Sequence, residues 1–313
     1  MKKYFYKNNK FRIIFTALII TLLSGCEKMD VLNPIGPVGE SQRDLIYYSL
    51  YFMAGIIIVV FSVFTYVVIK YRANRKNRTD NDYAPDMHGK TWVEVTWFIL
   101  PVIIVTALSI PTVQTLYQLE EPPESSNDEE PLVIYATSAD WKWIFSYPEE
   151  NIETVNHLYL PAERPVEFRL SSADSMASMW IPQIGGQKYS MAGMQNTQYL
   201  QADETGTYLG RNANFTGEGF TAQTFQVKVV TDTEFDGWVE DADASPELTK
   251  EKYDKILEPG LSEEMTFSST HLDWVDHGKN EFRDYSVEQH EEKYGEELEL
   301  KNVPGWNPNE IRE

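Results

Sequence analysis

Two long stretches without a charged side chain dominate the hydrophobic pattern of the first part of the chain. They run from Leu45 to Ile69 and from Val95 to Leu119, and each contains 25 residues. As helices they would be about 37 Å long at roughly 1.5 Å per residue, which is enough to cross a bilayer with some tilt. We therefore predict two transmembrane helices, at about residues 45–69 and 95–117. Pro101 falls inside the second, where a membrane bundle tolerates proline.

A third apolar run lies much nearer the amino terminus. It covers residues 13–23, follows a segment rich in Lys and Arg, and precedes Cys26. A basic end, a short apolar stretch and small residues before a cysteine are typical of a bacterial lipoprotein signal. We expect residues 1–25 to be removed and Cys26 to carry a diacylglyceryl group, whose two acyl chains would anchor the protein. An uncleaved anchor helix with a free or buried cysteine is the alternative.

The connection between the two predicted spans is basic. Six Lys and Arg residues lie between Lys70 and Lys90, both included. Positive charge in a short loop marks the cytoplasmic side of a membrane. Residues 26–119 would then form a lipid-anchored amino terminus and a two-helix hairpin in the bacterial cell membrane. Everything after Gln118 would be extracytoplasmic.

The pattern changes after the second span. Residues 120–130 are polar and contain prolines, as expected of a linker. Short β-type runs follow at Leu132–Thr137, Trp141–Tyr147, Thr154–Leu160, Pro165–Ser171, Gln198–Ala202 and Thr224–Val230. Many short strands separated by turn signals predict a β-sandwich or Greek-key barrel over residues 131–231. Residues 232–313 are expected to form an acidic arm and tail with a helix near 248–257. The fold class is therefore a membrane-anchored α+β protein.

Charge is distributed as unevenly as hydropathy. The net charge is −21, yet residues 1–119 hold 13 Lys and Arg against 8 Asp and Glu, whereas the remainder holds 14 against 40. This division fits a membrane part followed by an acidic water-exposed part. Nucleic acid is excluded as a partner because its phosphates would be repelled.

Two separated segments, residues 174–182 and the glycine-punctuated loop Gly206–Gln223, follow one common frame. They resemble the copper-binding loops of subunit II of the haem-copper oxidases, whose cytochrome c oxidase members hold a dinuclear copper centre there. The resemblance identifies six ligand positions, which in this sequence hold Ala177, Asn212, Asn214, Thr216, Phe220 and Gln223.

None of these six residues is the family's ligand. The two cysteine positions hold Asn212 and Thr216, and the two histidine positions hold Ala177 and Phe220. Such a copper centre needs bridging thiolates with imidazole and thioether around them, and Cys26 is the only cysteine of the chain. We therefore predict no metal in this chain. An ordinary turn region rich in Gly and Asn is the alternative interpretation of the loop.

The start of the second span, from His88 through Glu94 to Pro101, resembles the family's second-helix entrance. The resemblance places Glu94 at the cytoplasmic mouth of a proton-uptake channel of subunit I. A carboxylate at a membrane edge can collect a proton from water and pass it on. Without the resemblance, Glu94 is simply a residue favoured near a helix start by the helix dipole.

Loops of this frame without metal ligands resemble the quinol oxidase branch of the family, in particular its Gram-positive menaquinol type. The resemblance covers about residues 32–277. It implies a cupredoxin fold for residues 131–231, and a complex that oxidises quinol, reduces oxygen to water and pumps protons. Haems and copper would lie in subunit I, and smaller subunits would complete the complex. This chain would have no redox centre and would not need cytochrome c.

Two other functions remain open at this point. A cytochrome c oxidase subunit is disfavoured by Asn212 and Thr216. A lipid-anchored surface protein that binds or senses a ligand through its β-domain is the other alternative.

Three groups of side chains also need an interpretation. The aromatic run Trp141–Tyr147 resembles the strand near the surface where electrons enter cytochrome c oxidases, but packing explains it as well. We expect Met176 and Met179 to fill the volume of the missing metal. His271, His277 and His290 lack the spacing and the cysteines of a metal site.

Overall fold

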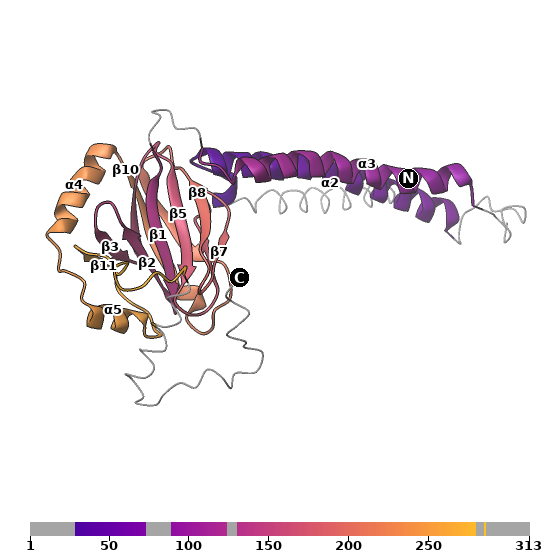
Figure 1. Ribbon diagram of the computed structural model, residues 1–313. Helices are drawn as coiled ribbons and strands as arrows, with labels where there is room; N and C mark the ends of the chain where they lie inside the picture. Colours follow the sequence, from indigo (N-terminus) through magenta and orange to yellow (C-terminus); the bar gives the residue numbers. More distant parts are fainter. Residues whose placement is uncertain (1–28, 73–88, 124–129, 280–284, 286–313) are drawn as a thin grey trace, which may run out of the picture.

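A computed structural model of the chain describes residues 29–72, 89–123, 130–279 and 285 (Figure 1). Two long helices form a hairpin that projects from one end of a β-sandwich, and the carboxyl-terminal arm lies on the side of the sandwich away from the hairpin. Cys26, His88 and His290 lie outside the described residues.

The two predicted spans are observed as helices, preceded by a short 3₁₀ turn: η1 (Asp30–Leu32), α2 (Pro37–Tyr71) and α3 (Thr91–Gln118). Both long helices are apolar and long enough to cross a membrane. α2 begins well before the predicted residue 45, because its first turns lie outside the apolar window and pack on the sandwich. Val38 and Gly39 are buried there.

One hydrogen bond joins the two helices inside the apolar zone. Pro111 has no N–H and therefore leaves the carbonyl of Ala107, four residues earlier in α3, without its helical donor. The hydroxyl of Tyr48 in α2 donates to this carbonyl at 3.2 Å. A lipid environment offers no water to a free carbonyl, so this bond stabilises the hairpin.

The segment before α2 is part of the sandwich core. Ile35 and Val38 are each 5% exposed and belong to the main hydrophobic cluster. The carbonyl of Ile35 accepts a hydrogen bond from the backbone N–H of Asp203 at 2.7 Å. A Cβ atom at Gly36 would overlap the carbonyl of Gln201, so only glycine fits. The sandwich is therefore attached to the hairpin before α2 as well as after α3.

The predicted β-sandwich is confirmed. Its first sheet has the strand order β11-β3-β2-β1-β5-β8, and its second has the order β4-β10-β9-β6-β7. The strands are β1 (Leu132–Ala139), β2 (Lys142–Tyr147), β3 (Ile152–Val155), β4 (His157–Pro161), β5 (Val166–Ser172), β6 (Ala177–Trp180), β7 (Lys188–Ser190), β8 (Asn196–Leu200), β9 (Gly206–Asn212), β10 (Thr224–Val230) and β11 (Met265–Phe267). Neighbouring strands are antiparallel except for β1 with β5 and β4 with β10.

Two sequence predictions about strands were wrong. The run Thr154–Leu160 is not one strand, because Asn156 adopts a positive φ of 60° and the chain passes there from β3 in one sheet to β4 in the other. The side-chain oxygen of Asn156 accepts from the N–H of Trp143 at 3.0 Å and fixes this crossing. The stretch predicted as a loop from Gly206 begins with a true strand, β9.

The aromatic strand β2 is a packing element. Trp143, Phe145 and Tyr147 are fully buried, and Phe225 of β10 lies against the first two at ring-centroid distances of 5.7 and 4.9 Å. All residues of β2 are buried, because the two sheets enclose one face of the strand and the arm covers the other. The packing interpretation of this run is therefore confirmed.

The arm contains two helices and a strand. α4 (Asp232–Asp243) begins with a capping box in which Thr231 and Glu234 satisfy each other's backbone N–H groups, and its Trp238 stacks on Tyr159 at 4.6 Å. α5 (Lys250–Leu257) lies where a helix was predicted, whereas α4 was not predicted as a helix. β11 then joins the first sheet beside β3, so the sandwich draws a strand from the arm.

Candidate functional site

The candidate site is the group of loops that the copper-site resemblance identified. β6 and β9 pair side by side with Met179 opposite Asn212, and the chain returns from β9 to β10 through residues 213–223, which include a 3₁₀ turn, η3 (Phe220–Ala222). This arrangement brings Asn212 and Gln223 next to each other, with a backbone hydrogen bond of 3.0 Å from the N–H of Asn212 to the carbonyl of Gln223.

The side chain of Asn212 is buried and makes four hydrogen bonds. Its oxygen accepts from the backbone N–H groups of Ser178 and Asn214, both at 2.9 Å. Its amide nitrogen donates to the side-chain oxygens of Gln223 at 2.8 Å and Thr216 at 3.2 Å. A primary amide has two acceptor and two donor sites, so the amide of Asn212 is saturated.

The side chain of Gln223 completes the network toward the first sheet. Only 1% of this residue is exposed. Its oxygen accepts from Asn212 and from the hydroxyl of Thr216, the latter at 3.3 Å. Its nitrogen donates to the hydroxyl of Ser138 at 3.0 Å and to the carbonyl of Lys142 at 3.1 Å. Gln223 therefore links the loop to β1 and β2, and its amide is saturated too.

Trp141 covers the loop. Its indole N–H donates to the carbonyl of Thr216 at 2.8 Å. The backbone of Gly219 lies so close to the ring that a Cβ there would overlap it, and Gly217 has a φ of 105°, which favours glycine. Gly219 is thus required because Trp141 leaves no room for a side chain, and Gly217 because the turn needs a positive φ.

The remaining predicted positions are placed differently. Ala177 is fully buried at the start of β6, beside the network. Asn214 donates to the carbonyl of Met176 at 2.7 Å. Phe220 packs against Phe215 at a ring-centroid distance of 5.7 Å.

The expectation that Met176 and Met179 fill the missing metal's volume was half wrong. Met179 is 1% exposed and lies in the core, whereas Met176 is 44% exposed.

These residues do not fit a dinuclear copper centre. Saturated amides have no lone pair left for a cation, and they cannot replace thiolates. In the described part of the chain there is no group of three or more His, Cys, Asp or Glu that could hold a metal ion. The arrangement can hold the loop in place.

An acidic pair borders the loop. The backbone N–H of Asp140 donates to the carboxylate of Asp174 at 2.7 Å, and Ser175 donates to the carboxylate of Asp140 at 2.5 Å. Burial raises the pKa of Asp174 to about 6, and the neighbouring charge of Asp140 adds to the effect.

A second buried polar cluster joins the arm to the first sheet, and sequence reasoning missed it. Glu153 of β3 and His271 of the arm are both fully buried, and their carboxylate oxygen and Nδ1 lie 2.6 Å apart. The same carboxylate oxygen accepts from the N–H of His271 and from the hydroxyl of Ser146, both at 3.0 Å. The only available signal was an acidic residue directly before the predicted run Thr154–Leu160.

His277 extends this cluster. Its Nε2 lies 2.7 Å from the hydroxyl of Tyr253 in α5, whose ring stacks on His271 at 4.4 Å. Burial, and then the nearby His271, lower the pKa of His277 to about 3. The structure therefore brings His271 and His277 together. Their contacts are with Glu153 and Tyr253, and they join the arm to the sheet.

Glu94 is not near either cluster. It is exposed in the first turn of α3, and Figure 1 shows that this end of the hairpin points away from the sandwich. The structure thus separates the loop site from the predicted proton site by the length of the hairpin.

These features define a class of protein. Two apolar helices of membrane-spanning length precede an extramembrane β-domain. That domain keeps the loop frame of an oxidase second subunit, but two of the frame's ligand positions, Asn212 and Gln223, hold amides that hydrogen-bond to each other.

Comparisons with known proteins agree. The family described as cytochrome C oxidase subunit II, transmembrane domain, matches residues 31–115. Quinol oxidase subunit 2 of Bacillus subtilis is 56% identical over 277 residues, which cover 88% of this chain and 85% of the relative. Probable quinol oxidase subunit 2 of Staphylococcus haemolyticus is 51% identical over 265 residues, covering 84% of this chain and 68% of the relative.

Among solved structures, the periplasmic domain of subunit II of cytochrome oxidase of Bradyrhizobium japonicum is 23% identical. That match covers 39% of this chain and 96% of the other, with a TM-score of 0.36. On the sequence relatives, this chain belongs to the quinol oxidase subunit 2 family, as the loop frame predicted. It is a membrane protein with two transmembrane helices and an extramembrane β-domain.

We predict that Gln223→Leu destabilises the sandwich by about 2–4 kcal/mol, because it leaves a donor of Asn212, the hydroxyl of Ser138 and the carbonyl of Lys142 without a partner inside the protein. Chemical unfolding of the purified chain in detergent, followed by tryptophan fluorescence, measures this loss. Gln226→Leu is the matched control, because Gln226 is exposed on β10, the strand that directly follows Gln223. Equal stability of the two variants would show that the network does not hold the loop.

We also predict that the arm loses stability in acid. The pKa of His277 is depressed in the folded state, so the unfolded chain binds the proton more tightly between pH 6.5 and about 3. The stability that neutral His277 contributes is therefore complete above pH 6.5 and lost as the pH falls toward 3, by up to about 1.4 kcal/mol per unit. Hydrogen exchange of α5 at pH 7 and pH 5 measures it.

The control for this experiment is His277→Gln, which cannot titrate. Burial also lowers the pKa of His157, so part of the acid sensitivity should remain in the variant. An identical pH dependence with and without His277 would contradict the prediction.

Proposed function

We propose that this chain is the non-redox second subunit of an oxidase complex that oxidises quinol, specifically menaquinol, reduces oxygen to water and pumps protons. The names of its relatives support the quinol part of this proposal. The observation that carries it is the saturation of the Asn212 and Gln223 amides, because a loop held by hydrogen bonds cannot relay electrons from cytochrome c.

In this proposal all redox groups lie in the partner. Subunit I holds the haems, the catalytic copper and the quinol site, and smaller subunits complete the complex. The present chain braces subunit I through its two helices and covers the outer face with its β-domain. A diacylglyceryl group on Cys26 anchors the amino terminus at the outer surface of the bacterial cell membrane, which agrees with an extracytoplasmic sandwich.

Glu94 provides the proposed link to proton uptake. It lies in the first turn of α3, at the end of the hairpin away from the sandwich, and it is exposed. A carboxylate there is positioned to take protons from the cytoplasm and deliver them to a polar file in subunit I. Its role is that of a positioned acid at a channel mouth, and it touches no reacting oxygen.

The function predicts which electron donor drives oxygen uptake. The complex is isolated from membranes in mild detergent through a tag on this chain and is offered menaquinol, ubiquinol or reduced cytochrome c. We expect uptake with quinol, fastest with menaquinol, and none with cytochrome c. Uptake with cytochrome c would contradict the proposal, and a chain that carries no oxidase with it would support a surface-binding protein instead.

The second prediction concerns Glu94. Glu94→Gln keeps the size of the side chain but cannot carry a proton, so turnover with quinol should fall severalfold, and the loss should grow with rising pH as protons become scarce. Oxygen uptake and proton release by the complex in vesicles measure both effects. Glu120→Gln, at the other end of α3, is the control. Unchanged turnover and pumping in Glu94→Gln would remove this residue from the mechanism.

A further inference from the structure

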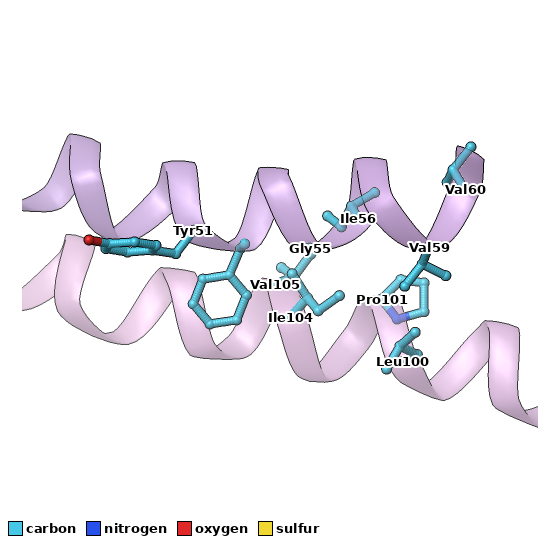
Figure 2. A pocket seen from close by; sticks show the side chains of 10 residues that line it. Tyr51, Gly55, Ile56, Val59, Val60, Leu100, Pro101, Ile104 and Val105 are labelled. Atoms are coloured by element: carbon cyan, nitrogen blue, oxygen red, sulfur yellow. The ribbon is translucent and has the colours of Figure 1, made fainter. Parts of the chain in front are cut away.

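The groove between α2 and α3 offers no ligand for an ion. Its volume is about 630 Å³, and no residue that lines it is charged or carries sulfur. Figure 2 shows Val59 on α2 beside Pro101 on α3, and Gly55 beside Ile104. An apolar surface of this kind is expected of any helix pair in lipid. Groups that could select a ligand lie on the sandwich instead.

One corner of the sandwich gathers three methionines. Residues 130–279 contain five methionines, and the two that are exposed are Met176, at 44%, and Met194, at 51%. Met191, in the same corner, is half-buried. Methionine is more often buried in a water-soluble domain, so two exposed thioethers in one corner are unusual.

Strand pairing places Met191 opposite both exposed methionines. Ala177 of β6 pairs with Ser190 of β7 in antiparallel register, so Met176 and Met191 occupy the next opposing positions beyond the ladder. Met191 also forms an antiparallel bridge with Met194 across a two-residue turn. Residues directly opposite each other in an antiparallel pair have Cβ atoms about 4.5–5.5 Å apart. Met191 is therefore a close neighbour of both.

The three thioethers share one face of the second sheet. Ala177 and Met179 belong to the core, and successive residues of a strand point to opposite faces, so Met176 lies on the outer face. Opposing residues share a face, which puts Met191 and Met194 there too. A methionine side chain has three rotatable bonds. The three sulfur atoms can therefore converge on one point.

The backbone of this corner is held in place by the rest of the domain. Gly193, in the turn that carries the bridge, has a φ of 69° and donates its N–H to the carbonyl of His277 at 2.9 Å. The side-chain amide of Asn214 donates to the carbonyl of Met176 at 2.7 Å. These bonds use backbone atoms of the corner and do not engage sulfur. A site fixed in advance loses less entropy when it binds its ligand.

Thioether sulfur is a soft ligand. It favours Cu(I), whereas carboxylate, carbonyl and water suit Mg, Ca and Mn. The charge of the domain also favours a cation, because residues 120–313 hold 40 Asp and Glu against 14 Lys and Arg.

We propose that Met176, Met191 and Met194 form a binding site for Cu(I) on the outer face of the sandwich. Neutral thioethers hold the ion reversibly, so the site gives the chain no resident redox centre. It differs in ligand type and in place from the loop positions around Asn212. The site binds copper whether or not the complex oxidises quinol, and it therefore goes beyond the proposed function.

Nuclear magnetic resonance of the methionine methyl groups tests which sulfur atoms bind. The full chain, isotope-labelled at these methyl carbons, is titrated in detergent with Ag(I), a redox-inert analogue of Cu(I). We expect the signals of Met176, Met191 and Met194 to shift together, and those of Met29 and Met265 to stay in place. Equal shifts at all five methionines, or no shift at Met191, would overturn the proposal.

Competition with a coloured Cu(I) chelator under reducing, oxygen-free conditions measures the affinity. Met191→Leu removes the shared ligand but keeps the volume, so the sandwich still folds, and Met265→Leu is the matched control in the arm. We expect Met191→Leu to weaken binding at least about tenfold, since losing even an outer partner of a metal ligand costs that much. Met265→Leu should bind as the unsubstituted chain does.

The pH dependence separates thioethers from other ligands. Thiolate and imidazole must lose a proton before they bind a metal, whereas a thioether has none to lose. We therefore expect the same Cu(I) affinity at about pH 6 and about pH 8. Weaker binding at the lower pH, or equal binding by the two leucine variants, would contradict a site made of these three methionines. Neither measurement needs oxidase activity, so this site and the proposed function can fail separately.

Discussion

The loop region of the extramembrane domain depends on one constraint: a buried side-chain amide needs a hydrogen-bond partner for each of its donor and acceptor sites. Asn212 and Gln223 obey it by bonding to each other and to Thr216, Ser138 and the backbone of Lys142. A loop in this frame needs something to hold its turns together. In this chain the two amides hold the turns of the loop together.

The arm depends on a similar compensation. Without the arm, the outer face of β2 would be exposed to water. α5 and the segment after it cover that face. A carboxylate, Glu153, lies in this interior and is accommodated because His271 and Ser146 donate to it. Lys142 is accommodated in the same way, with its ammonium donating to the carbonyls of Glu258 and Gly260. The buried polar residues of the sheet therefore depend on the arm for their hydrogen-bond partners.

Features that depend on neighbouring residues in the sequence could be predicted, whereas features that depend on contacts between distant residues could not. The two spans were predictable because a bilayer excludes charge over a continuous window, and β10 was predicted to the residue from its own apolar pattern. The crossing at Asn156 was missed because a positive φ leaves no mark in hydropathy. The Gln223 network was missed because its partners Ser138 and Lys142 lie 85 and 81 residues away in sequence. The resemblance to the family located the ligand positions, whereas only the structure shows the hydrogen bonds that the residues at these positions make.

The attachment of the sandwich before α2 has a mechanical consequence. With Ile35 and Val38 embedded in the core before α2 and Leu119 packed against the same core after α3, the domain is fixed to the hairpin at two points. A body held by a single tether swivels freely, whereas one held at two points can only tilt with its support. The hairpin and the sandwich would therefore tilt together. A small tilt of the helices within the bilayer would move the far side of the sandwich sideways by a larger distance.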